Sequence, residues 1–207
     1  MTRSADHSAP TGTHFSNGNI IGILLSAGLS QRFGGNKCLT PLDNGVAMGL
    51  QSARNLTGAV SQMVCVVRPE DEVLQQLYQD AGFDIAICAD ANLGISASLR
   101  AGIEFCDRAD GWLIALADMP WILPSTCERI AADLKTHGGI VAPTLNDKRG
   151  HPVGFSAQYA NELLSLRGDQ GARTLFDRHA EEVRLIPVND PGITLDIDQP
   201  GDLTCAP

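Results

Sequence analysis

Between residues 20 and 143 the sequence alternates between short apolar runs and longer stretches with helical periodicity. The first run, Ile20–Leu25, is continuously apolar and ends in a loop rich in Ser and Gly, which is typical of a strand covered on both faces. Further strand-like runs lie at residues 59–67, 83–89, 111–117 and 139–143. Helix-like stretches separate them, at residues 46–56, 70–80, 95–106 and 124–135. This alternation predicts a three-layer α/β/α domain in which helices cover both faces of a mostly parallel, twisted sheet.

The pattern is less regular after residue 143, but it gives no sign of a second domain. We expect a short strand at residues 152–155, helices at 157–166 and 172–179, and strands at 182–188 and 193–197. No internal repeat and no Pro-rich or Ser-rich linker follows residue 19. The first nineteen residues are polar and contain no apolar segment of the kind found in signal peptides. The sequence therefore predicts a flexible leader at residues 1–19 and one folded domain at residues 20–207.

Charge and composition restrict the partners of the chain. Its net charge of −9 disfavours nucleic acid and acidic membrane surfaces, since both are polyanions. The longest apolar runs, such as Ile20–Leu25 and Trp112–Ala117, are too short to cross a bilayer. The six cysteines show no Cys-x-x-Cys or Cys/His spacing, which favours reduced core thiols over zinc or disulfides. We therefore expect a cytoplasmic protein that binds neither nucleic acid nor membranes. An anionic substrate would need local positive charge, supplemented by a metal ion.

The loop after the first strand, residues 25–37, combines small residues with two cations, Arg32 and Lys37. Ligands of such sheets bind on the loops at the carboxyl ends of the strands. Small residues let the backbone approach a ligand, exposed N–H groups hold phosphate oxygens, and Arg and Lys add full positive charge. The loop is not a Walker loop, because Cys38 follows Lys37, and it lacks the Gly-x-Gly-x-x-Gly pattern of dinucleotide-binding folds. From these residues alone, a glycine-rich surface loop with two solvated cations is an equally good interpretation.

The same loop resembles the signature L-A-A-G-x-S-x-R-x-G-x-x-K of the MobA-like NTP transferases, with Ser26 in place of the first Ala. The resemblance implies a Rossmann-like fold of the nucleotide-diphospho-sugar transferase type. It implies that Arg32 and Lys37 bind the triphosphate and stabilise the departing pyrophosphate, and so act in catalysis. The other residues of the loop that it implies in nucleotide binding are Leu25, Ser26, Ala27, Gly28 and Ser30.

Two later segments resemble the same family, in the same order along the chain. Residues 94–99 resemble its Gly-hydroxyl-Ser-Leu segment, which implies that Ser96 and Ser98 lie beside the nucleotide. Residues 116–120 resemble its metal-binding L-A-D-M-P segment. This implies that Asp118 contacts the nucleotide, binds a metal ion and acts in catalysis.

The last third of the chain is similar to the cytidylyl branch of the family. Residues 149–153, 168–173 and 196–203 resemble its R-G-H-P-V, G-D-x-G-A-R and D-I-D-x-P-x-D-L segments. The resemblance implies that the acceptor substrate is contacted by Arg149, His151 and Arg173. A departure from the family pattern is Gly201, where a Glu is usual.

The carboxylates suggest a magnesium site on their own account. Asp118 follows an apolar strand, so its side chain should emerge at the sheet edge, where Mg²⁺ can bridge protein and triphosphate. The alternative is a helix N-cap or an Asx-turn. Asp196 and Asp198 alternate along the last strand-like segment and should share a face. They are candidates for a second metal contact or for a capping pair ahead of the following turn.

The acceptor candidates also have simpler interpretations. The basic segment Lys148–His151 fits a solvated turn, and Asp169 with Arg173, four residues apart, fits a helical ion pair. We do not expect His151 to act as a general base. A phosphate monoester is already largely ionised at neutral pH, so the nucleophile needs little deprotonation.

The resemblance implies a Mg²⁺-dependent nucleotidyltransferase that transfers CMP from CTP to molybdenum-bearing molybdopterin and releases pyrophosphate. CTP is favoured over GTP by the pair Ala27-Gly28, where guanylyl relatives usually carry Gly-Gly, and by residues 168–173. The alternatives are a GTP-using molybdopterin guanylyltransferase, a sugar- or polyol-phosphate cytidylyltransferase, and a non-catalytic carrier that hands the cofactor to a molybdenum hydroxylase. A carrier would need the phosphate loop but not the carboxylates, so their joint presence favours an enzyme.

Overall fold

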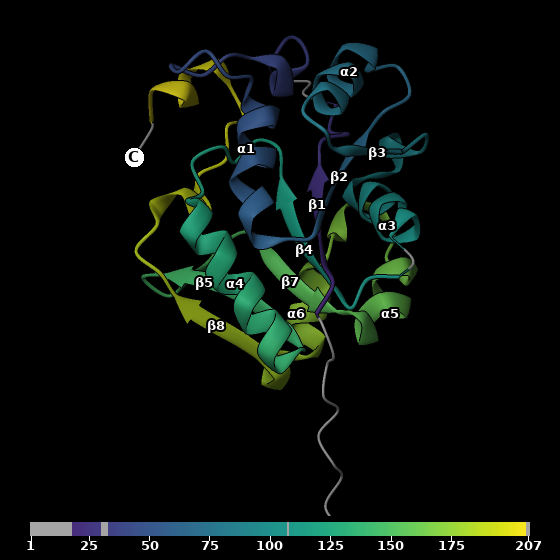
Figure 1. Cartoon of the computed structure of the whole chain (residues 1–207), viewed down its shortest axis with the longest axis vertical. Coiled ribbons are helices and arrows are strands. Elements are labelled where there is room, and N and C mark those ends of the chain that lie inside the picture. The colour runs from purple at the N-terminus through teal and green to yellow at the C-terminus, as the bar shows by residue number, and fades with distance from the viewer. Residues whose placement is uncertain (1–17, 30–32, 107, 206–207) are drawn as a thin grey trace, which may run out of the picture.

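The computed structural model describes residues 18–29, 33–106 and 108–205. Within these ranges an eight-stranded sheet runs through the centre of the molecule, with helices on both sides (Figure 1). The strands are β1 Ile20–Leu25, β2 Gln62–Val67, β3 Asp84–Ile87, β4 Gly111–Leu116, β5 Ile140–Leu145, β6 Lys148–Arg149, β7 Val153–Ser156 and β8 Val183–Pro187. The α-helices are α1 Met48–Leu56, α2 Glu72–Asp80, α3 Ile95–Phe105, α4 Pro124–His137, α5 Ala160–Ser165 and α6 Arg173–Arg178.

The sheet has the strand order β3-β2-β1-β4-β7-β5-β6, and β8 pairs with β5. Strands β1 to β4 are mutually parallel, β8 is parallel to β5, and β7 is antiparallel to both of its neighbours. The prediction of a mostly parallel α/β sheet is therefore confirmed. The chain leaves β1 toward β2 and β3 on one side and returns to β4 on the other. This reversal makes the carboxyl ends of β1 and β4 the switch point at which ligands of such sheets bind.

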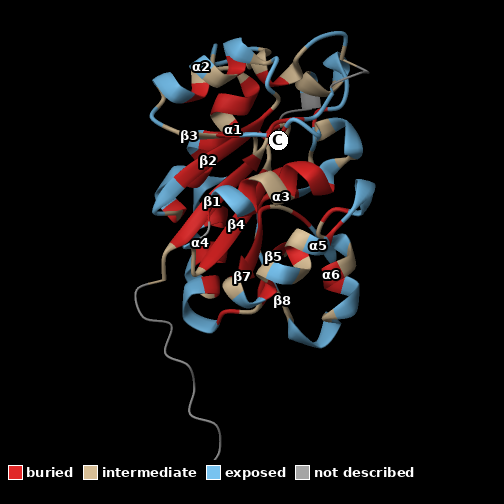
Figure 2. Cartoon of the chain, turned by 90° about the vertical axis from the view of Figure 1, so that its right-hand side faces the viewer, coloured by how far each residue is buried: buried red, intermediate tan, exposed pale blue. Residues whose placement is uncertain are grey.

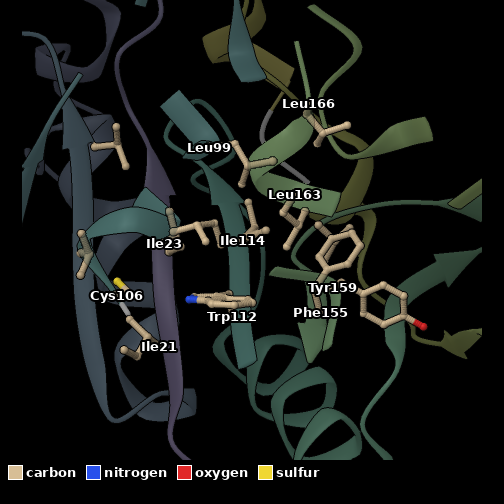
Figure 3. Close-up of a cluster of buried hydrophobic side chains, with 14 of the residues drawn as sticks. Ile21, Ile23, Leu99, Cys106, Trp112, Ile114, Phe155, Tyr159, Leu163 and Leu166 are labelled. Atoms are coloured by element: carbon tan, nitrogen blue, oxygen red, sulfur yellow. The ribbon is translucent and has the colours of Figure 1, made fainter. Parts of the chain in front are cut away.

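Two apolar cores hold the layers together, one on each face of the sheet. Alternate residues of β1 divide between them, since Ile21 and Ile23 face one core while Ile20 and Leu24 face the other. The first core packs against α3, α5 and α6, and Figure 3 shows Trp112 and Ile114 of β4 within it. The second packs against α1, α2 and α4. Buried strands lie between half-exposed helices in Figure 2. Each fully buried Ile or Leu contributes about 1.5–3 kcal/mol.

Residues 193–197 do not form the strand that the sequence suggested. Pro191–Thr194 forms a 3-10 turn, closed by the Asp190 side chain, which accepts a hydrogen bond from the Gly192 amide. The chain then runs along the loop after β4, where the Ile197 amide donates to the Asp118 carbonyl over 2.9 Å. The alternation of apolar and acidic residues thus reflects a segment packed against loops, not a sheet strand. The prediction that Asp196 and Asp198 share one face of a strand is therefore wrong, because no strand forms here.

Several shorter 3-10 turns connect the main elements. They are η1 Lys37–Leu39, η2 Thr57–Ala59, η3 Ala91–Leu93, η4 Ala157–Tyr159, η5 Gly168–Gln170, η6 Ala180–Glu182, η7 Pro191–Thr194 and η8 Pro200–Cys205. Among the described residues there is no helix whose length and apolar character would let it span a membrane.

Candidate functional site

A cavity of about 410 Å³ lies at the switch point, where the loops after β1 and β4 meet. The two strands are paired in parallel up to their last residues, Leu25 and Leu116, so the loops that follow begin side by side. The N-terminal end of α3 and the turn η5 form the other walls. The lining residues are Leu25, Ala27, Gly28, Leu29, Ala91, Asn92, Gly94, Ile95, Ser98, Leu116, Asp118 and Asp169.

Lys37 enters this site from the turn η1, which is capped by the Asn36 side chain. The Lys37 ammonium donates to Asp118 Oδ2 at 2.7 Å, to the Ile197 carbonyl at 2.8 Å and to Asp198 Oδ1 at 3.3 Å. Burial by itself lowers the pKa of Lys37, but the hydrogen bonds and charges of the two carboxylates outweigh it, so the pKa is raised. The amine is therefore fully charged at neutral pH.

Asp118 directs its second carboxylate oxygen into a buried position. Oδ1 is shielded from solvent and has no hydrogen-bond partner among the described residues, while Oδ2 accepts from Lys37. A buried carboxylate oxygen without a partner is costly, because it has lost its water and gained nothing in return. Such an atom needs a donor or a cation. The N-cap and Asx-turn alternatives for Asp118 have no support, since neither oxygen accepts from a described backbone amide.

The carboxylates of Asp118 and Asp198 converge on one point, at which the Lys37 ammonium now lies. Mg²⁺ is commonly held by one or two carboxylates, with substrate phosphates and water completing its six ligands. The orphaned Asp118 Oδ1 and the nearby Asp198 fit that donor set. Asp196 is exposed and makes no described contact with Lys37 or Asp118. No group of three or more His, Cys, Asp or Glu side chains with metal-binding geometry occurs in the described ranges, so a metal ion here would need ligands from its substrate.

The nucleotide-binding candidates fall into three groups. Leu25, Ala27, Gly28, Ser98 and Asp118 line the 410 Å³ cavity. Three described candidates do not line it: Lys37, which contacts Asp118 beside the cavity; Ser26, whose hydroxyl lies 2.9 Å from the Tyr78 hydroxyl; and Ser96, whose buried Oγ lacks a partner among the described residues. Ser30 and Arg32 lie outside the described residues.

The sequence interpretation missed the contribution of Gly94 and Asp169 to this cavity. Gly94 has a φ of +98°, and a Cβ atom there would lie 2.3 Å from Asp169 Oδ1. Only glycine fits both the backbone angle and the close approach. The close approach of Gly94 to Asp169 joins the start of α3 to the turn η5 and so closes one wall of the cavity. Asp169 ends up facing both this cavity and the next one, a relationship between distant segments that no local pattern indicates.

A second cavity of about 240 Å³ adjoins the first and shares Ile95, Leu116 and Asp169 with it. All three acceptor candidates, Arg149, His151 and Arg173, line this second cavity. The structure thus places them together, beside the cavity that contains the phosphate-loop residues.

Arg149 and Arg173 bring positive charge to the second cavity. The Arg149 guanidinium stacks over the Phe176 ring at 3.7 Å from its centroid, which fixes the side chain in a cation–π contact. Burial lowers the pKa of Arg149, and the charge of Arg173 lowers it further, although Asp177 opposes both. No ion pair joins Asp169 to Arg173 in the described structure, because Asp169 lies in η5 and Arg173 begins α6. The helical ion pair is therefore not the role of these residues.

His151 is held at the cavity by its backbone. Its amide donates to the Ile193 carbonyl at 2.9 Å, and a Cβ atom on the preceding Gly150 would lie 2.2 Å from that same carbonyl. His151 Nδ1 is buried and has no partner among the described residues. Burial lowers the pKa of His151 below its usual value, with Asp118 partly opposing the shift. The imidazole is therefore neutral at pH 7, and because its one N–H donates to the Ile114 backbone, Nδ1 is left as a hydrogen-bond acceptor.

Comparison with known proteins is consistent with this geometry. Residues 22–183 match the family described as MobA-like NTP transferase domain. The purine catabolism protein PucB of Bacillus subtilis is 29% identical over 193 residues, covering 87% of this chain and 92% of that protein. A phosphoenolpyruvate guanylyltransferase of Sphaerobacter thermophilus is 28% identical over 172 residues, covering 80% of this chain and 76% of that protein.

Solved structures with the same fold include a homologue of Rv0371c from Mycobacterium sp. strain JC1. It is 31% identical, with a TM-score of 0.78, and the match covers 91% of this chain and 97% of that one. The Mycobacterium tuberculosis H37Rv protein Rv0371c, solved as a complex with manganese, is 28% identical, with a TM-score of 0.74 and the same coverage of both chains.

Proposed function

Because the chain belongs to the MobA-like NTP transferase domain family, we propose that it transfers CMP from CTP to a molybdopterin-type phosphorylated acceptor and releases pyrophosphate. The observation that carries the proposal is the meeting of Lys37, Asp118 and Asp198 beside the switch-point cavity. An acidic protein can hold a triphosphate only where cations gather locally. Here one ammonium and two carboxylates able to hold a divalent ion lie within reach of a single ligand.

The residues of the 410 Å³ cavity would bind the nucleotide. Ala27 and Gly28 present a small backbone surface, and no described atom lies within 4 Å of the position that a Cβ on Gly28 would occupy. A phosphate can therefore approach this backbone closely. When the triphosphate binds, the Lys37 ammonium would exchange its carboxylate partners for phosphate oxygens. It would then stabilise the negative charge that develops on the leaving pyrophosphate.

A bound Mg²⁺ would neutralise triphosphate charge and polarise the phosphate that is attacked. Asp118 Oδ1 and Asp198 are the groups that would hold it, and a relative of this chain has been solved with manganese. The manganese is a property of that relative, and Mg²⁺ in this chain is part of the proposal.

The second cavity supports the placement of the acceptor. Arg149 and Arg173 would bind its phosphate, and the neutral imidazole of His151 would accept one hydrogen bond from a donor group elsewhere on the acceptor molecule. An acceptor phosphate oxygen attacks the α-phosphorus, a new P–O bond forms, and the bond to the β-phosphate breaks as pyrophosphate leaves. The attacking oxygen is already ionised, so no side chain needs to remove a proton. Catalysis then consists of alignment and charge neutralisation.

The choice of CTP and of a molybdopterin acceptor rests on sequence resemblance. Ala27-Gly28 and residues 168–173 support CTP, and the latter segment lines both cavities through Asp169. The product would be a cytosine dinucleotide cofactor, for which a molybdenum hydroxylase is the proposed recipient.

Pyrophosphate release tests the proposal directly. Purified protein would be mixed with Mg²⁺, molybdenum-loaded molybdopterin and, in separate reactions, CTP, GTP or ATP. We expect release with CTP that depends on both the acceptor and the metal. Release with GTP alone would replace CTP by GTP in the proposal. Release with CTP and a sugar phosphate, but not with molybdopterin, would replace the acceptor. No release under any condition, with tight cofactor binding, would identify a carrier and overturn the enzyme assignment.

A further inference from the structure

Helix α1 carries two buried polar side chains on the face that packs against the Asp118 loop. Ser52 is 2% exposed and donates from its hydroxyl to the Ala117 carbonyl at 2.9 Å. Asn55 is 7% exposed and donates from its amide to the Pro120 carbonyl at 2.8 Å. The two acceptors flank Asp118 in the chain. The helix is therefore hydrogen-bonded to the loop on both sides of Asp118, whose carboxylate faces the cavity.

The other end of α1 is attached to the segment that carries Lys37. The amide of Met48, the first residue of the helix, donates to the Thr40 carbonyl at 2.8 Å. A Cβ atom on Gly49 would lie 3.0 Å from the Cβ of Cys38, so helix and turn η1 are in close backbone contact. One rigid element thus contacts the supports of both Lys37 and Asp118, which form the ion pair of the site.

The amide of Asn55 is itself fixed by a chain of side chains. Gln51 Nε2 donates to Asn55 Oδ1 at 2.8 Å, and Asn44 Nδ2 donates to Gln51 Oε1 at 3.0 Å. These bonds define which end of the Asn55 amide faces the loop, because its oxygen is occupied on the side of Gln51. Its nitrogen is thereby left to donate to Pro120. A buried amide with both ends satisfied holds its partner more firmly than packing alone.

We propose that Ser52 and Asn55 are positioning residues, which hold Asp118 at the place where its Oδ1 binds the divalent ion that accompanies the nucleotide. The inference rests on the proposed function. Apolar residues of α1 such as Ala53 and Leu56 already attach the helix to the core, so stability alone does not require two buried donors. The donors act on the Ala117 carbonyl, one residue before Asp118, and on the Pro120 carbonyl, two residues after it. Loss of the Ser52 and Asn55 donors would leave the fold in place but would let the Asp118 carboxylate move.

The test measures Mn²⁺ binding by electron paramagnetic resonance, with CTP present, in the full-length protein. Asn55→Leu keeps the side-chain size and removes the donor, and Ser52→Ala removes the second donor. Arg54→Ala, an exposed change on the same helix, is the matched control. We expect Mn²⁺ affinity to fall at least 5-fold in Asn55→Leu, to fall less in Ser52→Ala, and to stay unchanged in Arg54→Ala. The thermal midpoint of each variant is measured in parallel.

The outcomes separate this inference from the function on which it rests. If the wild-type protein binds no Mn²⁺ with CTP, the proposed function is at fault. If the wild type binds and both variants bind equally well, the positioning role is wrong, whether or not their thermal midpoints fall. Should Asn55→Leu fail to fold, Gln51→Ala takes its place. This variant keeps the donor but frees its orientation, and a 2-fold or greater loss of Mn²⁺ affinity is expected. An unchanged affinity in Gln51→Ala and Ser52→Ala would overturn the inference.

Discussion

Lys37 and Asp118, 81 residues apart in the chain, meet at 2.7 Å through Nζ and Oδ2. Their side chains are 12% and 20% exposed, so this ion pair is partly withdrawn from water. It brings a cation from the loop after β1 to a carboxylate from the loop after β4. The pair also means that, without ligand, the ammonium neutralises the carboxylates on which a divalent ion would depend.

Replacing Lys37 should therefore have opposite effects on two ligands. In Lys37→Met the carboxylates of Asp118 and Asp198 lose their cation, so Mn²⁺ alone should bind at least about 5-fold more tightly than to the wild type, given the strength of nearby charges in a partly buried site. CTP should bind more weakly, because a phosphate partner is gone. Isothermal titration with each ligand separately measures both changes. Lys135→Ala, an exposed change on α4, is the control. Weaker Mn²⁺ binding in Lys37→Met would contradict the idea that the Lys37 ammonium and the divalent ion compete for the same carboxylates.

The two C-terminal aspartates should differ in their effect on the metal. Asp198 Oδ1 lies 3.3 Å from the Lys37 ammonium, whereas Asp196 is exposed and makes no described contact with the site. Asp198→Asn should raise the Mg²⁺ concentration for half-maximal pyrophosphate release by about 5- to 10-fold, equivalent to ~1–1.4 kcal/mol. Asp196→Asn, the matched control, should leave it unchanged. Equal effects of the two changes would remove Asp198 from the metal site.

A histidine that lines neither cavity should make stability depend on pH. His179 lies between Glu162 and Glu182, and hydrogen bonding to Glu162 raises the pKa of the imidazole despite some opposing burial. A raised pKa means that the protonated ring stabilises the fold below its unfolded pKa of about 6.5. This stabilisation is lost as the pH rises through the folded pKa. The carboxylates contribute in the opposite sense, since hydrogen bonds to His179 and Arg178 lower the pKa of Glu162.

The check compares thermal midpoints of the wild type and His179→Gln. Their difference should be largest near pH 5.5, where the imidazole is charged and the carboxylates are ionised, and should shrink by about pH 9. Glu162→Gln should bring the pKa of His179, followed by proton resonance, back down. A constant difference between the two proteins across this range would show that the histidine acts only through packing. Added salt should reduce the effect, because these groups are partly exposed to solvent.

The sheet was predictable from sequence because its strands are buried on both faces. Runs such as Ile20–Leu25 must be apolar throughout, and this pattern is visible without tertiary information. The strand predicted at residues 193–197 was wrong for a related reason. Ile193 and Ile197 are fully buried, as strand residues would be, but loops cover them. The periodicity of apolar residues indicates which positions are buried, but not which element covers them. The antiparallel β7 and the hairpin that turns at Asn146 and Asp147, both with positive φ, gave no signal strong enough to change the expected topology.

The site was predictable only where charge stands next to a strand end. Asp118 stood out for that reason and Lys37 because it lies in the small-residue loop that follows β1, but their contact depends on how β1 and β4 pair. Ser52 and Asn55 were missed because a polar residue in a helix usually faces solvent. A signal was present: Met48, Ser52 and Asn55 lie at spacings of four and seven, on the stripe of α1 that should be apolar. Gly94 and Asp169 could not be paired from sequence, because a close contact between distant loops leaves no periodic trace.

The most direct test of the account is CTP-dependent pyrophosphate release by Asp118→Asn, with Asp80→Asn on the exposed end of α2 as its control. The change preserves size and removes the charge that faces both Lys37 and the divalent ion. We predict that turnover at saturating CTP, acceptor and Mg²⁺ falls at least about 100-fold, equivalent to ~3 kcal/mol of transition-state stabilisation, while the control keeps wild-type turnover. Turnover in Asp118→Asn within a few-fold of the wild type would contradict the assignment of this carboxylate, and with it the proposed site.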